Sequence, residues 1–220
     1  MRSLRFALIA ATLAASTAFA SPTAPVNGAD YTTLAQPQPT QATGKKVEVI
    51  EFFAYHCPAC NMLEPSLNQW IKKQGDNIVM RRVHLPFQGP ADPEAHLFLT
   101  LEAMGKLEEY HPRVFQAVHV QRQRLMKDDA IIEWAAKNGL DRAKFMETWN
   151  SFGVTSKLRR LQTLSSNYKV TGTPTIIIDG KYVVSPSQVG EANKINGIEP
   201  TMQATMQVMD ALVKKAAATK

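Results

Sequence analysis

The stretch VEVIEFFAYHCPAC, residues 47–60, holds both cysteines of this 220-residue chain, directly behind a run of β-branched and aromatic residues. Such a run predicts a strand over 47–55 that is covered on both faces. Pro58 is of the type favoured in the first turn of a helix, so a helix is expected to begin at Cys57 or Pro58. The pair Cys57 and Cys60 therefore lies where a strand ends and a helix begins.

The spacing of the two cysteines favours a redox pair over a structural crosslink. A disulfide that closes so short a loop removes only about 2 kcal/mol of unfolded-state entropy in the chain-entropy model. Cys57, at the start of the helix, is the expected reactive thiol, and Cys60, one turn further and more buried, the expected resolving thiol. The helix dipole supplies at most about 2 kcal/mol, so a large fall in the pKa of Cys57 also needs hydrogen bonds from backbone N–H groups and from the Cys60 thiol. A stabilised thiolate favours the reduced form, which makes the protein an oxidant of other thiols.

Other uses of paired cysteines are weaker or remain open. A structural zinc site needs four ligands, which this chain does not offer at finger spacing, and covalent haem attachment needs His after the second cysteine, where Asn61 stands. A Cu(I) ion held by both thiolates stays as an alternative, and it would make the protein a metallochaperone. The same exchange chemistry run in reverse, as a reductase or isomerase, is another. We predict no resident metal and no cofactor.

The order of predicted elements indicates an α/β fold with a helical insertion. Strands are expected at residues 31–34, 47–55, 78–85, 175–178 and 181–184. Helices are expected to run from Cys57 or Pro58 to Gln74, from Asp92 to Met104, from Asp128 to Asn138, from Asp141 to Trp149, after Ser156 and from near Thr201. Asp179-Gly180 predicts a type I′ hairpin between the last two strands. A face of the last helix is expected in the core, formed by Met202, Met206, Met209 and Val213.

The first twenty residues have the form of a bacterial export signal. Arg2 and Arg5 precede an apolar run, and Ala18-Phe19-Ala20 has the small residues of a cleavage site, so the cut is expected after Ala20. No later stretch approaches the roughly 20 apolar residues of a membrane span, and we expect a periplasmic protein. Its net charge is +6, or 23 − 19 = +4 without Arg2 and Arg5, which is too mild to predict nucleic-acid binding.

Glu51 is unusual because it interrupts the apolar strand six residues before Cys57. Burial there raises the pKa of a carboxyl group, which could then pass a proton to or from Cys60. Alternatively, Glu51 reaches solvent or pairs with a cationic side chain of the next strand, from among Arg81, Arg82 and His84.

Pro174 begins a predicted strand in the sequence Gly172-Thr173-Pro174-Thr175. Because only about 5–6% of X–Pro bonds in folded proteins are cis, the residues by themselves favour a trans proline at a strand start.

Several motifs together resemble the DsbA family of periplasmic thiol:disulfide oxidoreductases: YTTL at 31–34, EFF at 51–53 leading into CPAC, WNSF at 149–152 and GKY at 180–182. The resemblance covers nearly the whole chain after Ala20. It implies a thioredoxin fold, formed by residues 21–91 and 169–220, with an inserted helical domain at 92–168.

The resemblance also implies roles for individual residues. Cys57 is the attacking cysteine, Cys60 its partner, Glu51 the buried acid and Pro174 a cis-proline packed against the disulfide. The family oxidises newly exported proteins and is reoxidised by the membrane quinone reductase DsbB. We expect a monomer. A dimeric isomerase is disfavoured, because the roughly 25 residues between the predicted cut and the strand at 47 leave no room for the N-terminal dimerisation domain of such proteins.

Two residues depart from the family pattern. Ala59 follows Pro58 where the family usually has His, so we expect a higher Cys57 pKa and a weaker oxidant than a Pro-His relative. His56 could partly compensate, or it could cap the surface or contact substrate. Thr173 stands where Val is common, at an edge expected to pair with a bound substrate strand.

Overall fold

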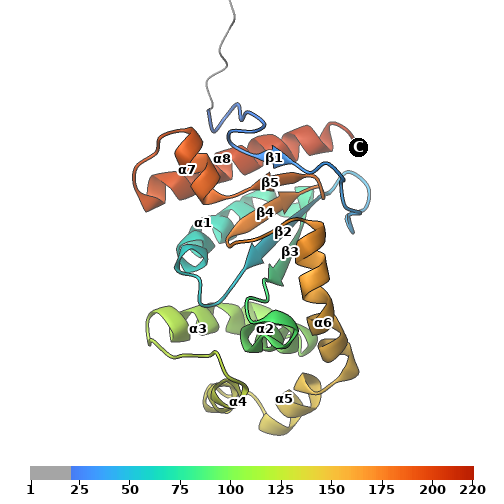
Figure 1. Ribbon diagram of the computed structural model, residues 1–220, viewed down its shortest axis with the longest axis vertical. Helices are drawn as coiled ribbons and strands as arrows, with labels where there is room; N and C mark the ends of the chain where they lie inside the picture. Colours follow the sequence, from blue (N-terminus) through green and yellow to red (C-terminus); the bar gives the residue numbers. More distant parts are fainter. Residues whose placement is uncertain (1–20) are drawn as a thin grey trace, which may run out of the picture.

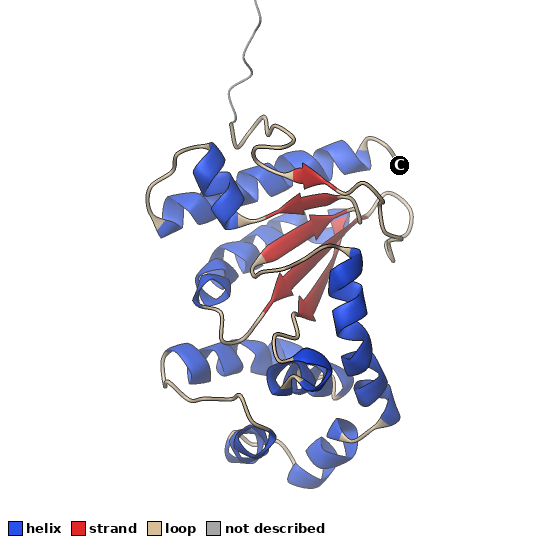
Figure 2. Cartoon of the chain, viewed as in Figure 1, coloured by secondary structure: helices blue, strands red, loops and turns tan. Residues whose placement is uncertain are grey.

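The computed structural model describes residues 21–220, so the predicted export signal lies outside the described residues (Figure 1). At its centre is a five-stranded sheet in the order β1-β5-β4-β2-β3. The strands are β1 (Thr32–Thr33), β2 (Val47–Phe53), β3 (Ile78–His84), β4 (Thr175–Ile178) and β5 (Tyr182–Val184). Strands β2 and β3 are parallel, and the other neighbouring pairs are antiparallel. Figure 2 shows this sheet enclosed by helices.

The helices divide between two hydrophobic cores. One core includes side chains of α1 (Pro58–Gln74), α7 (Pro186–Ala192) and α8 (Ile198–Ala217). The other includes side chains of α2 (Pro93–Ala103), α3 (Leu107–His119), α4 (Asp128–Lys137), α5 (Arg142–Trp149) and α6 (Phe152–Asn167). Short 3₁₀ turns at Gly75–Asn77 and Gly89–Ala91 flank β3 and precede α2. In Figure 1 the helices α2 to α5 form a block beyond one end of the sheet, and α6 leads back to it.

Alternation along β2 distributes its side chains between two hydrophobic cores. Val47 and Val49 pack with α1 and α8, whereas Ile50 and Phe52 belong to the core that continues into the helices α2 to α6. Because side chains repeat every second residue, Glu51 has the same direction as Val49 and lies under α1.

The sequence predicted most element positions within two residues, but four helices differ from the expectation. Helix α6 begins at Phe152 and not after Ser156, because the Ser151 side chain accepts a hydrogen bond from the Val154 N–H group and caps the helix earlier. Helix α8 begins at Ile198, before the expected start near Thr201. Helices α3 and α7 were not located individually, although α3 falls inside the region predicted to be helical.

Other expectations are confirmed. Asp179 and Gly180 both have positive φ, as a type I′ turn requires. The four side chains of the expected core face of α8 are all buried, namely Met202, Met206, Met209 and Val213. Between residues 21 and 220, no helix is both long enough and apolar enough to cross a bilayer.

Candidate active site

Both cysteines take their positions from the junction between β2 and α1. Cys57 is the N-cap residue of α1 and Pro58 occupies its first turn, as the sequence predicted. Both cysteines are free thiols, with Cys57 partly exposed and Cys60 fully buried. An incoming reactant can therefore reach the first sulfur but not the second.

The Cys57 sulfur is surrounded by groups that stabilise its thiolate. It accepts a hydrogen bond from the Cys60 N–H group at 3.3 Å. The pKa of Cys57 is lowered to about 5, chiefly by a hydrogen bond from the Cys60 thiol, with further bonds from the Thr173 side chain and the backbone N–H groups of Cys60 and Ala59. Partial burial opposes this shift. Direct hydrogen bonds thus contribute to the lowered pKa of Cys57, in addition to any effect of the helix dipole.

Cys60 has the opposite character. Burial, together with its hydrogen bond to Cys57 and the charge of that neighbour, raises the pKa of the Cys60 thiol far above its ordinary value. At neutral pH the pair therefore holds one thiolate and one thiol, and the negative charge resides on the accessible sulfur.

The peptide bond between Thr173 and Pro174 is cis. This is the form that the family resemblance implied, and the interpretation of Pro174 as a trans residue was wrong. The loop before β4 brings the Thr173 carbonyl oxygen to 3.4 Å from the Cys57 sulfur, although the two residues are 116 positions apart. Thr173, the first residue of this cis peptide bond, therefore borders the reactive sulfur.

Glu51 combines the two alternatives that the sequence left open. Its side chain is fully buried, and its Oε2 accepts a hydrogen bond from Arg82 Nε at 3.1 Å. Its Oε1 is buried with no hydrogen-bond partner. The pKa of Glu51 is raised to about 8 by burial and by the charge of Glu64, against the opposing effect of Arg82. Glu51 can therefore hold or release a proton near neutral pH.

His56 is held by a residue that the sequence analysis did not single out. Its Nδ1 lies 2.6 Å from Oε2 of Glu94, and its backbone N–H group donates to the same oxygen at 3.2 Å. The side chain of His56 is 34% exposed and that of Glu94 only 1%. The hydrogen bond to Glu94 raises the pKa of His56 despite partial burial, which favours an imidazolium next to Cys57.

Glu94 itself stays ionised inside the protein. Burial opposes its charge, but hydrogen bonds and charges from His56 and His84 outweigh burial and lower the pKa of Glu94 to about 2. The sequence placed Glu94 in the first turn of the helix expected from Asp92 to Met104 and gave it no role at the cysteines. Its contact with His56 spans 38 positions, and no local pattern signals it.

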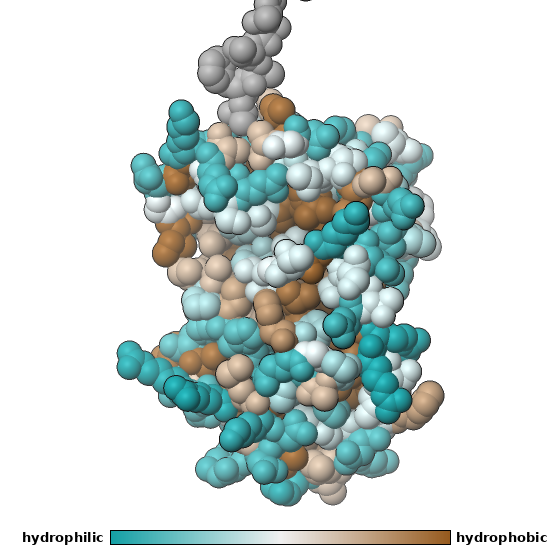
Figure 3. Space-filling view, in the orientation of Figure 1, coloured by the Kyte–Doolittle hydropathy of each residue, from teal (hydrophilic) through white to brown (hydrophobic). Residues whose placement is uncertain are grey.

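Hydrophobic side chains are exposed near the site and elsewhere. The Phe87 ring is 49% exposed and meets the His56 ring edge to face at 5.2 Å between centroids. Figure 3 shows hydrophobic side chains gathered in the middle of one face, over the sheet and its border with the helical block.

Within residues 21–220, His, Cys, Asp and Glu side chains do not gather in groups of three or more suited to a metal ion. The Cu(I) alternative needs only the two cysteine thiolates, so this observation does not test it.

Comparisons with known proteins agree with this geometry. The family model described as DSBA-like thioredoxin domain matches residues 48–193. The chain is 39% identical over 208 residues to the thiol:disulfide interchange protein DsbA of Burkholderia cepacia, covering 94% of this chain and 93% of the relative. It is 34% identical to the DsbA of Pseudomonas syringae pv. tomato, covering 99% of both chains.

Solved structures are similar as well. The crystal structure of Pseudomonas aeruginosa DsbA superposes with a TM-score of 0.76 at 33% identity, covering 88% of this chain and 96% of that one. The oxidoreductase NmDsbA1 from N. meningitidis has a TM-score of 0.72 at 29% identity, covering 88% and 95%.

Proposed function

The chain belongs to the DsbA family and is a thiol:disulfide oxidoreductase, and from this premise we propose that it acts as an oxidase that donates a Cys57–Cys60 disulfide to newly exported proteins. The observation that carries the direction of transfer is the stabilised Cys57 thiolate. A sulfur that is stable as a thiolate is a good leaving group and favours the reduced form, so the closed disulfide tends to pass to other thiols.

The proposed reaction consists of two exchanges. A substrate thiolate attacks the Cys57 sulfur, the Cys57–Cys60 bond breaks, and Cys60 takes up a proton as it leaves. A second substrate thiolate then attacks the substrate sulfur of the mixed disulfide and releases Cys57 as a thiolate. Two electrons pass from the substrate to the cysteine pair, and the substrate gains one disulfide.

Glu51 is the proposed proton donor and acceptor for Cys60. Its carboxyl group is buried close enough for its charge to raise the pKa of Cys60, and its own pKa of about 8 lets it exchange a proton near neutral pH. Protonated Glu51 would supply the proton when the disulfide opens, and ionised Glu51 would remove it when the disulfide is formed again.

Three residues near Cys57 are proposed to stabilise its thiolate or to form the substrate site, namely Thr173, Pro174 and His56. The backbone at Thr173 borders Cys57 and can pair with an extended substrate strand. The imidazolium of His56 would partly replace the positive charge that Ala59 does not carry, while Ala59 acts through its backbone N–H group.

The cellular setting follows the family. We propose that the protein is exported to the periplasm, is cut after Ala20, works as a monomer and is reoxidised by a DsbB-like membrane quinone reductase. A purified DsbB-like reductase with quinone should restore the disulfide at a rate that depends on both cysteines.

The equilibrium redox potential in glutathione buffers tests the oxidase direction. We expect a value well above that of thioredoxin, which is about −270 mV. A value near or below −270 mV would overturn the direction and favour a reductase. Titration of the reduced protein with Cu(I) tests the other alternative, and tight stoichiometric binding would support a metallochaperone.

A further inference from the structure

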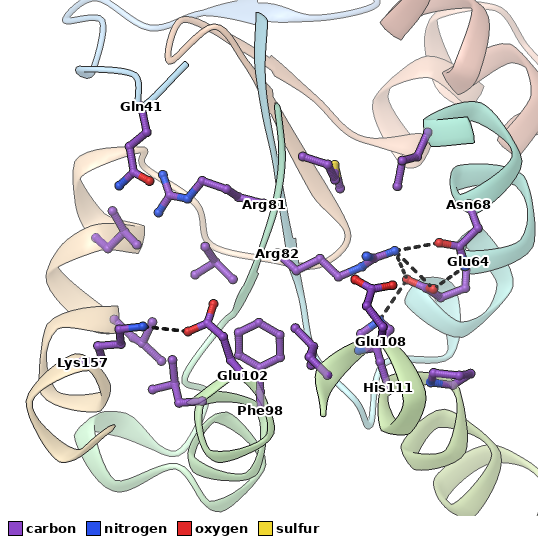
Figure 4. A pocket seen from close by; sticks show the side chains of 18 of the residues that line it. Gln41, Glu64, Asn68, Arg81, Arg82, Phe98, Glu102, Glu108, His111 and Lys157 are labelled. Carbon is purple, nitrogen blue, oxygen red and sulfur yellow. Dashed lines mark hydrogen bonds and ion pairs between the residues drawn. The ribbon is translucent and has the colours of Figure 1, made fainter. Parts of the chain in front are cut away.

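Hydrogen bonds connect helix α3 of the predicted insertion to the buried side of the disulfide site. We call the residues that they join the Glu64 network, which comprises Tyr55, Glu64, Asn68, Arg82 and His111. Tyr55 Oη lies 3.1 Å from Nδ1 of His111, and Nε2 of His111 lies 3.3 Å from Oε1 of Glu64. Figure 4 shows His111 approaching Glu64 from α3 while Arg82 reaches it from β3.

Arg82 is shared between two carboxylates, but not equally. Its Nε donates to Oε2 of Glu51 at 3.1 Å, and its terminal nitrogen donates to Oδ1 of Asn68 at 2.8 Å. Both oxygens of Glu64 lie 3.5 Å from that nitrogen, at the limit of a hydrogen bond. Glu64 instead receives its shorter bonds from Asn68, at 2.9 Å, and from His111.

The partners of His111 fix which nitrogen carries the proton. Burial lowers the pKa of His111, so the ring is neutral at pH 7. The ionised Glu64 carboxylate can only accept, so the proton of the neutral ring is on Nε2, and the unprotonated Nδ1 accepts from the Tyr55 hydroxyl. His111 therefore acts on Glu64 as a hydrogen-bond donor without adding a charge.

We propose that His111 is a positioning residue for disulfide exchange: by donating to Glu64 it satisfies that carboxylate and leaves Arg82 bound to Glu51. The inference rests on the proposed role of Glu51 in proton transfer. Without the donor from α3, Glu64 would compete for Arg82, and Glu51 would lose part of the positive charge that favours its ionised form.

Glu64, Asn68, Arg82 and His111 form part of the wall of a cavity of about 940 Å³ between β3, α1, α2, α3 and α6. Cys57 and Cys60 are not among its lining residues, so this part of the network borders a space other than the one at the reactive sulfur. Several titratable groups surround Glu51 and His111. Glu51 is close to Glu64, Arg82, Cys57, Cys60 and Tyr55, whereas His111 is close to Glu64, Arg82, Tyr55 and Glu108.

The test is a double-mutant cycle read out on Glu51. The pKa of Glu51 is followed in reduced protein by carboxyl carbon NMR, with the signal assigned by its loss in Glu51→Gln. We expect His111→Leu to raise this pKa by about half a unit, roughly a threefold shift in proton concentration. Glu64→Gln should lower it, because the substitution removes both a negative charge and the competitor for Arg82. Adding His111→Leu to Glu64→Gln should then change nothing further.

Two further variants separate positioning from folding. His111→Gln keeps an N–H donor and should retain most of the parental pKa. His96→Gln alters another buried histidine of the same helical region, bonded to the Trp149 carbonyl oxygen, and should leave the pKa of Glu51 unchanged. An unchanged or lower pKa in His111→Leu, or an equal rise in the Glu64→Gln background, would overturn the inference. If Glu51→Gln exchanges disulfides at the parental rate, the proposed role of Glu51 fails instead.

Discussion

Cys57 and Cys60 are three residues apart and hydrogen-bonded to each other, yet the first sulfur borders an exposed region and the second a buried region. Cys57 is partly exposed, receives several hydrogen bonds and has a pKa of about 5, whereas burial raises the pKa of Cys60. The exposed region, with His56 and Thr173, stabilises an anion. The buried region, with Glu51, handles a proton. A disulfide that connects such regions can be opened at one end and protonated at the other.

The largest effects are expected from exchanging either sulfur for oxygen. Cys57→Ser should reduce oxidation of a dithiol peptide to the uncatalysed rate, because the attacked and accessible sulfur is lost. Cys60→Ser should also abolish net oxidation, but its Cys57 thiolate should attack the disulfide form of the peptide, release one peptide thiolate and leave a mixed disulfide that mass spectrometry detects. Equal trapping by Cys57→Ser would contradict the division of roles between the two regions.

Removing the acid of the buried region should have the next largest effect. Glu51→Gln is expected to slow the step that protonates or deprotonates Cys60 by about 10- to 100-fold near neutral pH. Stopped-flow measurement of exchange against pH should also lose an inflection near pH 8. Glu48→Gln is the matched control, since Glu48 is an equally buried carboxylate of β2 paired with Arg81 at 3.2 Å. An equal loss in both variants would assign the effect to stability.

The anion of the exposed region should make the stability of the reduced protein depend on pH. Because folding lowers the pKa of Cys57, its contribution is complete above the ordinary thiol pKa of about 8.5 and is lost as the pH falls through about 5. Between pH 7 and pH 4, the reduced form should lose on the order of 2 kcal/mol relative to the oxidised form, after discounting for the partial exposure of the sulfur. Denaturant unfolding of both forms measures this difference, and a constant difference would contradict the stabilised thiolate.

The smallest effect is expected from restoring a histidine between the cysteines. Ala59→His should lower the Cys57 pKa by up to about one unit, and His56→Gln should raise it by a similar or smaller amount. Titration of the thiolate by its ultraviolet absorbance measures both. Lys181→Ala, at the hairpin, serves as a control for the loss of a positive charge elsewhere. If Ala59→His does not lower the pKa of Cys57, the absence of a positive charge at position 59 does not decide how stable the thiolate is.

The sequence by itself determined strand β2, the start of helix α1 and the choice of Cys57 and Cys60 as the candidate redox pair. Those features depend on side-chain alternation and on preferences of the first helical turn, which act over a few residues. The same local logic predicted that Cys57 would be the thiolate and that a large fall in its pKa would need hydrogen bonds as well as the helix dipole. The start of α6 was misplaced because a single serine side chain, that of Ser151, decides it.

Only the tertiary structure decided what surrounds the sulfurs. The contacts of Thr173 with Cys57, of Glu94 with His56 and of His111 with Glu64 join residues 116, 38 and 47 positions apart. Glu51 could be recognised from the sequence as a buried acid, but not its partners, since Arg82 faces it through the parallel pairing of β2 and β3. Burial and long-range hydrogen bonds set the pKa of each group, and both arise only when distant segments pack together.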